Sequence, residues 1–327
     1  MTAIPKTHRR VVLARRPPGE PAEADFRVEE VAVPVPRHGE VLVKVLWLSL
    51  DPYQRGRMRD AASYAPAVGI GEVMTGGTVG EVVASQHPGF AVGDIVEDRL
   101  GWQEYAIGGG PTLRKVDPSI APISTANGIL GMPGMTAYFG LLEVGQPKPG
   151  ETVVVSAASG AVGQAVGQIA RIMGCRVVGI AGGRRKCDFV TAELGFDACV
   201  DYKAEKDLDA ALRAACPNGI DVYFDNVGGE ITDAVLRNIN FFGRVALCGS
   251  ISQYKRHDAA HGTAPARHLR RQARARPGLH RHRLRRALRP GPPPDGRVGP
   301  HRPPQVPRGR RRGHRAGAAR LHRHAAR

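Results

Sequence analysis

The chain has few cysteines for its 327 residues and lacks any long apolar run. Five cysteines in a chain of this length exclude a small fold held together by disulfides. No apolar stretch approaches the ~18 residues of a membrane-spanning helix, and the N-terminus lacks the continuous apolar region of a secretion signal. Because 42% of the residues are nevertheless apolar, we expect a cytoplasmic protein with ordinary hydrophobic cores.

Acidic residues are scarce only at the C-terminal end. The formal net charge is +17, but residues 261–327 hold 20 arginines, no lysine and a single aspartate. The first 260 residues therefore have a net charge of −2. The charge of the whole chain thus says little about the body, which is slightly acidic and gives no sign of a nucleic-acid partner.

Residues 261–327 also lack ten residue types: Ile, Phe, Tyr, Trp, Met, Lys, Glu, Asn, Ser and Cys. A segment whose apolar residues show no helix or strand periodicity, and whose positive charges repel one another, is expected to be disordered. We therefore treat 257–327 as a low-complexity basic tail. Arg, Pro, Ala, Gly and His, which dominate this segment, are the residues that GC-rich DNA encodes when it is read out of frame. We therefore interpret the segment as the product of a frameshift near Tyr254. The alternatives are a natural solvated tail and a nucleic-acid-binding tail. The absence of aromatic residues that stack on bases argues against nucleic-acid binding.

The region 1–125 contains short alternating apolar runs broken by Gly and Pro, for example Glu40–Val45, Gly77–Val83 and Val92–Val96. This pattern predicts a small, antiparallel, barrel-like domain that is rich in β-strands. A helical stretch over Gly131–Val144 then leads into the second region.

The region 126–256 alternates apolar strands with helices every 20–25 residues or so, which predicts an α/β fold with a doubly wound parallel sheet. We predict strands at Thr152–Ser156, Cys175–Ile180, Ala198–Val200, Asp221–Phe224 and Arg244–Cys248, and helices at Val162–Met173, Lys186–Leu194, Leu208–Ala215 and Ile231–Asn238. A sixth strand would fall after Tyr254, where the basic tail begins, so we expect the sheet to be truncated and the chain as written to be impaired.

The strongest local motif is the run Ala157–Gly163, which contains A-x-G-x-x-G between a predicted strand and a predicted helix. Small residues at this turn let the backbone approach a pyrophosphate, whose charge is stabilised by the helix N-terminus. About 20 residues later an NAD site has a carboxylate for the ribose hydroxyl. Here Gly182–Lys186 has no acid and three cations, which favours a 2′-phosphate and therefore NADP. Tyr202 could line the same adenosine pocket.

Several stretches resemble the zinc-independent branch of the medium-chain dehydrogenases/reductases, in particular the NADPH-dependent alkenal, prostaglandin and curcumin reductases. They are Leu50–Met58, Gly71–Met74, Gly131–Leu142 and Tyr223–Gly229. The resemblance covers about residues 8–254 and implies a GroES-like substrate domain joined to a Rossmann domain. The implied NADP contacts are Gly160, Ala161, Val162, Gly163, Lys186, Tyr202, Asn226, Cys248, Gly249, Ser250, Ile251 and Ser252. In this family the segment after the fifth strand often forms a dimer edge, so a homodimer is expected only if that segment were intact.

The cysteines argue against a metal site. All five lie in the second half, and none has the spacing of zinc ligands. Where zinc alcohol dehydrogenases place a cysteine ligand, this chain has Ser49–Tyr53.

Without a metal, NADPH can add hydride to an already activated carbon. We therefore predict reduction of the C=C bond of an α,β-unsaturated ketone or aldehyde. The developing enolate needs a hydrogen-bond donor, for which Tyr53 and Tyr254 are the candidates. A quinone reductase of the same superfamily is the alternative enzyme.

Overall fold

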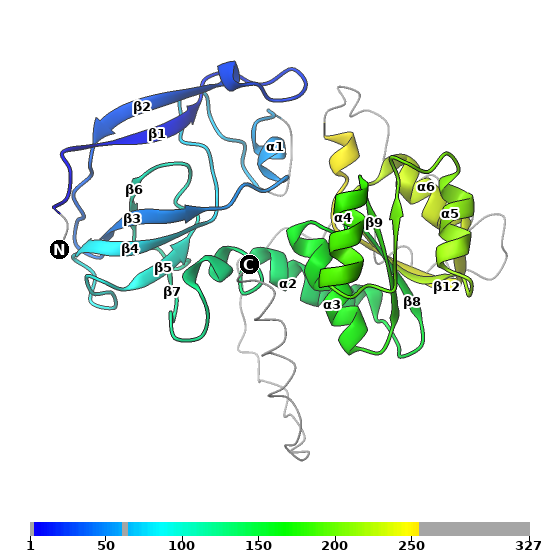
Figure 1. The fold of residues 1–327 in the computed structure, drawn as a ribbon. Helices are drawn as coiled ribbons and strands as arrows, with labels where there is room; N and C mark the ends of the chain where they lie inside the picture. Colours follow the sequence, from blue (N-terminus) through cyan, green and yellow to red (C-terminus); the bar gives the residue numbers. More distant parts are fainter. Residues whose placement is uncertain (1–2, 61–64, 255–327) are drawn as a thin grey trace, which may run out of the picture.

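The computed structural model describes residues 3–60 and 65–254, which form two parts joined near residue 130 (Figure 1). The predictions made for residues 257–327 lie outside the described residues. None of the helices within 3–60 and 65–254 combines the length and the apolar character that a membrane crossing requires.

The N-terminal part consists of antiparallel sheets, as predicted. One is a hairpin of two strands, and the other has five strands in the order β6-β3-β4-β5-β7. The strands are β1 (Thr7–Leu13), β2 (Phe26–Ala32), β3 (Val41–Leu48), β4 (Thr78–Ser85), β5 (Ile95–Asp98), β6 (Tyr105–Gly108) and β7 (Arg114–Lys115). The predicted run Val92–Val96 is partly wrong, because Gly93 at φ +93° forms a turn and β5 begins only at Ile95.

Two small cores hold this part together. Val41, Val43 and Val82 pack inside the five-stranded sheet. Leu13 and Met58 belong to a second cluster, which lies beside the short helix α1 (Gln54–Arg57). This second core fixes the loop that contains Tyr53, and α1 lies on the side of the N-terminal part that faces the other part (Figure 1).

The C-terminal part is a parallel sheet of five strands in the order β10-β9-β8-β11-β12. All five predicted strands are present, as β8 (Thr152–Ser156), β9 (Arg176–Ala181), β10 (Ala198–Asp201), β11 (Ile220–Asp225) and β12 (Ile239–Leu247). Strands β9 and β10 follow β8 toward one edge of the sheet. The chain then crosses back, and β11 pairs with β8 on its other side. This is the doubly wound topology that the sequence predicts.

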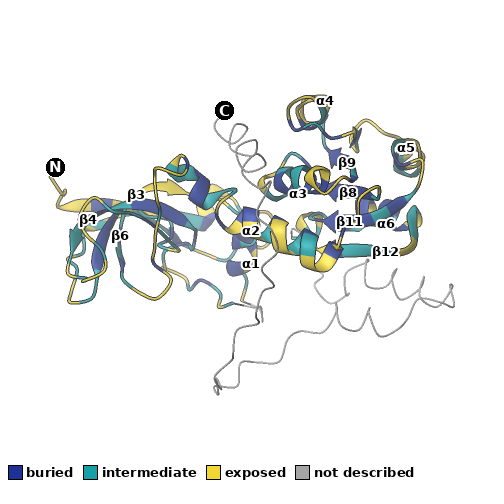
Figure 2. Cartoon of the chain, turned by 90° about the horizontal axis from the view of Figure 1, so that it is seen from below, coloured by how far each residue is buried: buried dark blue, intermediate teal, exposed yellow. Residues whose placement is uncertain are grey.

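Helices cover both faces of the parallel sheet. Val153 and Val155 of β8 pack in one core with α2 (Met132–Phe139) and α3 (Ala161–Ile172). Val154 points to the opposite face, toward α5 (Leu208–Ala215) and α6 (Gly229–Arg237). Figure 2 shows β8, β9 and β11 as mostly buried, the edge strand β12 as mostly intermediate, and α4 as largely exposed. Continuous apolar strands therefore reflect burial on both sides.

Three predicted boundaries differ from the structure. The predicted helix over 131–144 is α2 followed by a π-helical turn, Gly140–Gly145, and the one over 186–194 is α4 (Arg184–Asp188) followed by a π-helical turn, Phe189–Glu193. Strand β12 begins five residues earlier than predicted, at Ile239. Within the described residues β12 pairs only with β11 and so forms one edge of the sheet.

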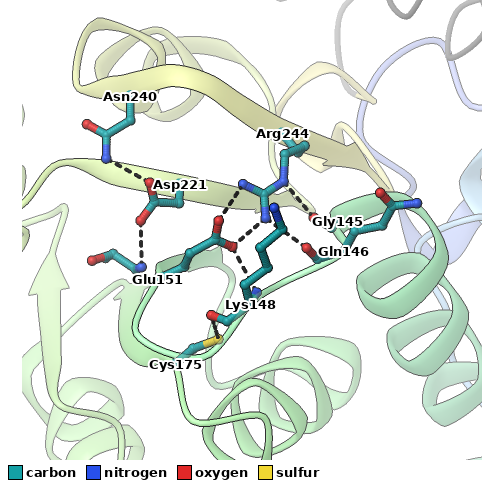
Figure 3. Close-up of polar contacts among 9 residues, drawn as sticks. Gly145, Gln146, Lys148, Glu151, Cys175, Asp221, Asn240 and Arg244 are labelled. Carbon is teal, nitrogen blue, oxygen red and sulfur yellow. Dashed lines mark hydrogen bonds and ion pairs between the residues drawn. The ribbon is translucent and has the colours of Figure 1, made fainter.

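A polar network ties the strands together at their amino ends (Figure 3). The Arg244 guanidinium makes a two-pronged ion pair with Glu151 and donates to the carbonyl oxygens of Gly145 (3.0 Å) and Gln146 (2.8 Å). Asp221 accepts from the Thr152 backbone N–H at 2.9 Å. The network joins β12, β11 and the turn before β8 at the edge opposite the loops described below.

Replacing Arg244 by methionine should lower the free energy of unfolding by about 1–3 kcal/mol, because Glu151 would keep its charge without the guanidinium in a largely buried place. Their side chains are only 27% and 20% exposed. Arg213→Met is the matched control, since Arg213 is 61% exposed and lies 3.8 Å from Asp209. Urea unfolding of both variants checks this, and an equal, small loss for both would contradict it.

The same pair predicts a dependence of stability on pH. Burial raises the pKa of Glu151, but hydrogen bonds from Arg244 and from the Lys148 backbone N–H outweigh it and hold the pKa below its usual value. A carboxyl with a lowered folded pKa adds stability above its unfolded pKa of about 4.3, and loses it as the pH falls through the folded value. As the pH is lowered through this range, the free energy of unfolding of Arg244→Met should therefore fall less steeply than that of the unaltered chain.

Candidate functional site

The predicted cofactor residues come together at the carboxyl edge of the parallel sheet. They lie in the loops and first helical turns that follow β8, β9, β10, β11 and β12, and carboxyl ends of parallel strands share one edge. The strand order reverses between β8 and β11, where connections leave toward opposite sides. A crevice at such a switch point is where open α/β sheets bind ligands.

The turn from β8 to α3 is built for close approach of an anion. Ala157 has a positive φ of +50°, and a Cβ on Gly163 would lie 2.9 Å from the Ala158 Cα and closer still to the Ala157 carbonyl oxygen. Only glycine at 163 therefore lets the helix start directly against the turn. The backbone N–H groups of the first turn, at Ala161, Val162 and Gly163, have no partner within the helix, and such groups can bind an anion.

Asn226 joins the two strands that flank the switch point. Its side-chain nitrogen donates to the Ser156 carbonyl oxygen at 2.7 Å, and its backbone N–H donates to the Ser156 hydroxyl at 2.9 Å. The predicted role of Asn226 toward the cofactor is untested, and its amide N–H groups already hold β8 and β11 together. Ser156 was missed by the sequence analysis, because a serine at the end of an apolar strand gives no signal of its own.

Asp225 organises the loop after β11. The carboxylate is 1% exposed and accepts hydrogen bonds from Val227 N–H (2.9 Å), Gly228 N–H (2.9 Å) and the Thr232 hydroxyl (2.6 Å). The Tyr223 hydroxyl also donates to it at 2.9 Å, and burial raises the pKa of Tyr223 well above its usual value, so that tyrosine keeps its proton. This cluster fixes where Asn226 projects.

The loop after β12 rests on the loop after β11. The backbone N–H groups of Cys248 and Gly249 donate to the Asp225 carbonyl oxygen at 2.8 and 3.0 Å, and Ser252 N–H donates to Val227. Ile251 N–H also donates, to the Asn226 carbonyl oxygen at 3.3 Å. Since these donors are engaged within the protein, the predicted contacts of Cys248, Gly249, Ile251 and Ser252 would have to use carbonyl oxygens and side chains.

Cationic residues surround the turn after β9. Gly183, at φ +98°, donates its N–H to Asp201 at 2.7 Å, and α4 begins at once with Arg184, Arg185 and Lys186, all exposed. The Tyr202 ring packs on Gly182, where a Cβ would lie 2.8 Å from the hydroxyl. Asp201 is a carboxylate that the sequence analysis missed, because it comes from the neighbouring strand and orients this turn through the backbone.

The two candidate tyrosines come from segments that are far apart in the sequence. Tyr53 precedes α1 and is half-buried, with the Arg57 guanidinium 5.9 Å from its ring centre. The hydroxyl of Tyr254, also half-buried, lies over Gly249, 3.5 Å from where a Cβ would be. Arg59, just after α1, donates to the Tyr254 carbonyl oxygen. This contact joins the two parts of the chain at Tyr254, and sequence reasoning gave no hint of it.

In the described part of the chain, no three His, Cys, Asp or Glu side chains are grouped so that they could hold a metal ion. The five cysteines are free thiols.

Comparisons with known proteins agree with this geometry. A family model described as the N-terminal domain of oxidoreductase matches residues 9–116, and one described as zinc-binding dehydrogenase matches residues 161–282. The NADPH-dependent curcumin reductase of Escherichia coli is 53% identical over 247 residues, covering 76% of this chain and 71% of that protein. The NADP(+)-dependent 2-alkenal reductase of Nicotiana tabacum is 49% identical, covering 76% and 74%.

A solved structure is similarly close. CurA from Vibrio vulnificus, determined in complex with NADPH, is 50% identical and superposes with a TM-score of 0.76 over 82% of this chain and 79% of that one.

Proposed function

Because the chain belongs to the zinc-independent branch of the medium-chain dehydrogenases/reductases, we propose that it is an NADPH-dependent reductase of the C=C bond in α,β-unsaturated ketones and aldehydes. Its partner is a small molecule. The E. coli and N. tabacum relatives are named for curcumin and 2-alkenals, both of which contain such a bond conjugated to a carbonyl group.

The observation that supports this proposal most is the β8–α3 turn at the switch point. Gly163 lets α3 start against the turn, and the N–H groups of Ala161 and Val162 at the start of this helix could bind a pyrophosphate. The cations at the start of α4, with Lys186 and Tyr202 at adjacent strand ends, suit the 2′-phosphate of NADP. Residues 160–163, 186, 202, 226 and 248–252 would thus hold the dinucleotide along one edge of the sheet.

Bound NADPH supplies a hydride to the β-carbon of the substrate. The protein then has to stabilise the negative charge that develops on the carbonyl oxygen. We assign that role to the Tyr53 hydroxyl, which would donate a hydrogen bond to this oxygen. Tyr254, whose carbonyl oxygen accepts a hydrogen bond from Arg59, is the second candidate donor and the candidate for protonating the α-carbon.

A product analysis tests this function. The full chain, NADPH and a simple enone such as 3-buten-2-one should give the saturated ketone, with label from deuterated NADPH at the β-carbon. Formation of an allylic alcohol instead, or no consumption of any enone in a panel, would overturn the assignment.

Replacing Tyr53 by phenylalanine should lower kcat about a hundredfold and leave the affinity for NADPH unchanged, because only the charge on the substrate oxygen loses its donor. Tyr105→Phe is the matched control, since Tyr105 lies on β6 in contact with His8. Steady-state rates and NADPH titrations of both variants check this. A Tyr53→Phe variant with full activity would transfer the role to Tyr254.

A quinone as acceptor is the second candidate. The solved quinone oxidoreductase of Coxiella burnetii is 22% identical, which is a likeness of fold alone. Quinones therefore belong in the same assay panel, and faster turnover with them than with every enone would favour that function. Binding of nucleic acid concerns residues 257–327, outside the described residues, and a homodimer and a cytoplasmic location stay predictions.

A further inference from the structure

Two thiols lie in contact beside the cationic turn. Cys187 is on α4, directly after Lys186, and Cys199 is on the edge strand β10. Their sulfur atoms are 3.0 Å apart. A disulfide bond is about 2.05 Å long, so closing it needs the sulfurs to approach by about 1 Å.

We propose that Cys187 and Cys199 form a reversible disulfide that acts as a redox switch on the cofactor site. The proposed bond itself depends only on the contact of the two thiols. Its effect on NADPH rests on the function proposed above, because Lys186 is the neighbour of Cys187 in the chain.

The local structure can accommodate this change. Helix α4 has only five residues and continues as a π-helical turn from Phe189, where Thr191 bonds back to the Cys187 carbonyl oxygen at 3.1 Å. Departures from regular α-helix at such turns are common at functional sites. Cys187 and Cys199 are both partly exposed, so a small oxidant can reach the pair.

The contact also assigns the two thiols different roles. The Cys199 thiol donates to the Cys187 sulfur, which favours loss of the proton from Cys187 first. Burial nonetheless raises the pKa of both thiols, so few thiolates exist at neutral pH. Oxidation is therefore expected to be slow near pH 7 and to speed up as the pH rises.

A small-molecule disulfide such as oxidised glutathione serves as the oxidant. The Cys187 thiolate attacks one of its sulfurs, forms a mixed disulfide and releases one glutathione thiolate. Cys199 then gives up its proton, and its sulfur attacks Cys187, breaking the mixed bond and releasing the second glutathione. The protein dithiol loses two electrons, which reduce one glutathione disulfide to two thiols.

Peptide mapping without reductant tests the bond. After treatment of the full chain with oxidised glutathione, the peptides with Cys187 and Cys199 should be linked, faster at pH 9 than at pH 7, and separated again by dithiothreitol. Cys199→Ser should give only the mixed disulfide on Cys187. Cys175→Ser is the control and should link like the unaltered chain. A Cys187 that stays free, or that keeps glutathione in the unaltered chain, would overturn the proposal.

Titration with NADPH tests the switch. Linking should raise the Kd for NADPH about fivefold and leave that for NADH unchanged, because the movement is confined to the start of α4. The double variant C187S/C199S treated in the same way should keep the Kd of the reduced protein, because neither position can then take up glutathione. A linked chain with an unaltered Kd would refute the switch. Failure of the reduced chain to bind NADPH at all would instead refute the proposed function.

Discussion

Replacing Gly163 by alanine should raise the Kd for NADPH at least about tenfold and lower the free energy of unfolding by about 1–3 kcal/mol. The added Cβ would meet only backbone atoms, among them the Ala158 Cα at 2.9 Å. Backbone cannot rotate away as a side chain can, so α3 has to move off the turn. Its free N–H groups then leave the place where the pyrophosphate is expected.

The control for Gly163→Ala is Gly110→Ala. Gly110 lies in the N-terminal part, and a Cβ there would have no heavy atom within 4 Å. Circular dichroism and urea unfolding of both variants separate a loss of fold from a loss of binding. A Gly163→Ala variant that binds NADPH as tightly as the unaltered chain would contradict the cofactor site at this turn.

Replacing Lys186 by glutamine should raise the Kd for NADPH about five- to tenfold and leave that for NADH unchanged. The 2′-phosphate would lose a charged hydrogen bond, whereas NADH has only an uncharged hydroxyl at that position. The preference of the unaltered chain should also shrink as salt is added, because Lys186 is exposed and its charge is screened.

Lys6→Gln is the matched control for Lys186→Gln, since Lys6 is an exposed lysine in the N-terminal part. Fluorescence titrations with both dinucleotides give the four affinities. If Lys186→Gln lost affinity for NADPH and NADH equally, the lysine would contact another part of the cofactor. If it lost no affinity for either, its role would be contradicted.

The parallel sheet could be predicted from the sequence because its strands are buried on both faces. Val153–Val155, for example, is a run of apolar residues that are all fully buried in β8. Strand β1 was missed for the opposite reason. Arg9 and Arg10 in it form ion pairs with Glu104 and Glu29, and these interrupt the apolar alternation by which half-buried strands are recognised.

The π-helical turns and the early start of β12 could not be predicted either. A helix that continues with a wider turn at Gly140–Gly145 has the same apolar residues as a regular one. In β12, Phe242 takes a positive φ of +63°. The pairing of β12 with β11 also shifts register between Ile220 and Val222 of β11. Neither feature follows from the pattern of residues.

The candidate site was predicted where a single turn is enough to define it. The strand–turn–helix at Ala157–Gly163 is local, and so is the cationic turn after β9. Contacts between distant residues were missed. Ser156 with Asn226 and Arg59 with Tyr254 are separated by 70 and 195 residues, and only the folded chain brings them together.

Calorimetric titration of the reduced, full chain with NADPH and with NADH tests the central claim most directly, namely that the carboxyl edge of the parallel sheet binds the phosphorylated dinucleotide. We predict one site per chain, with NADPH bound at least about tenfold more tightly than NADH. Equal affinities, or no heat of binding with either dinucleotide, would contradict it.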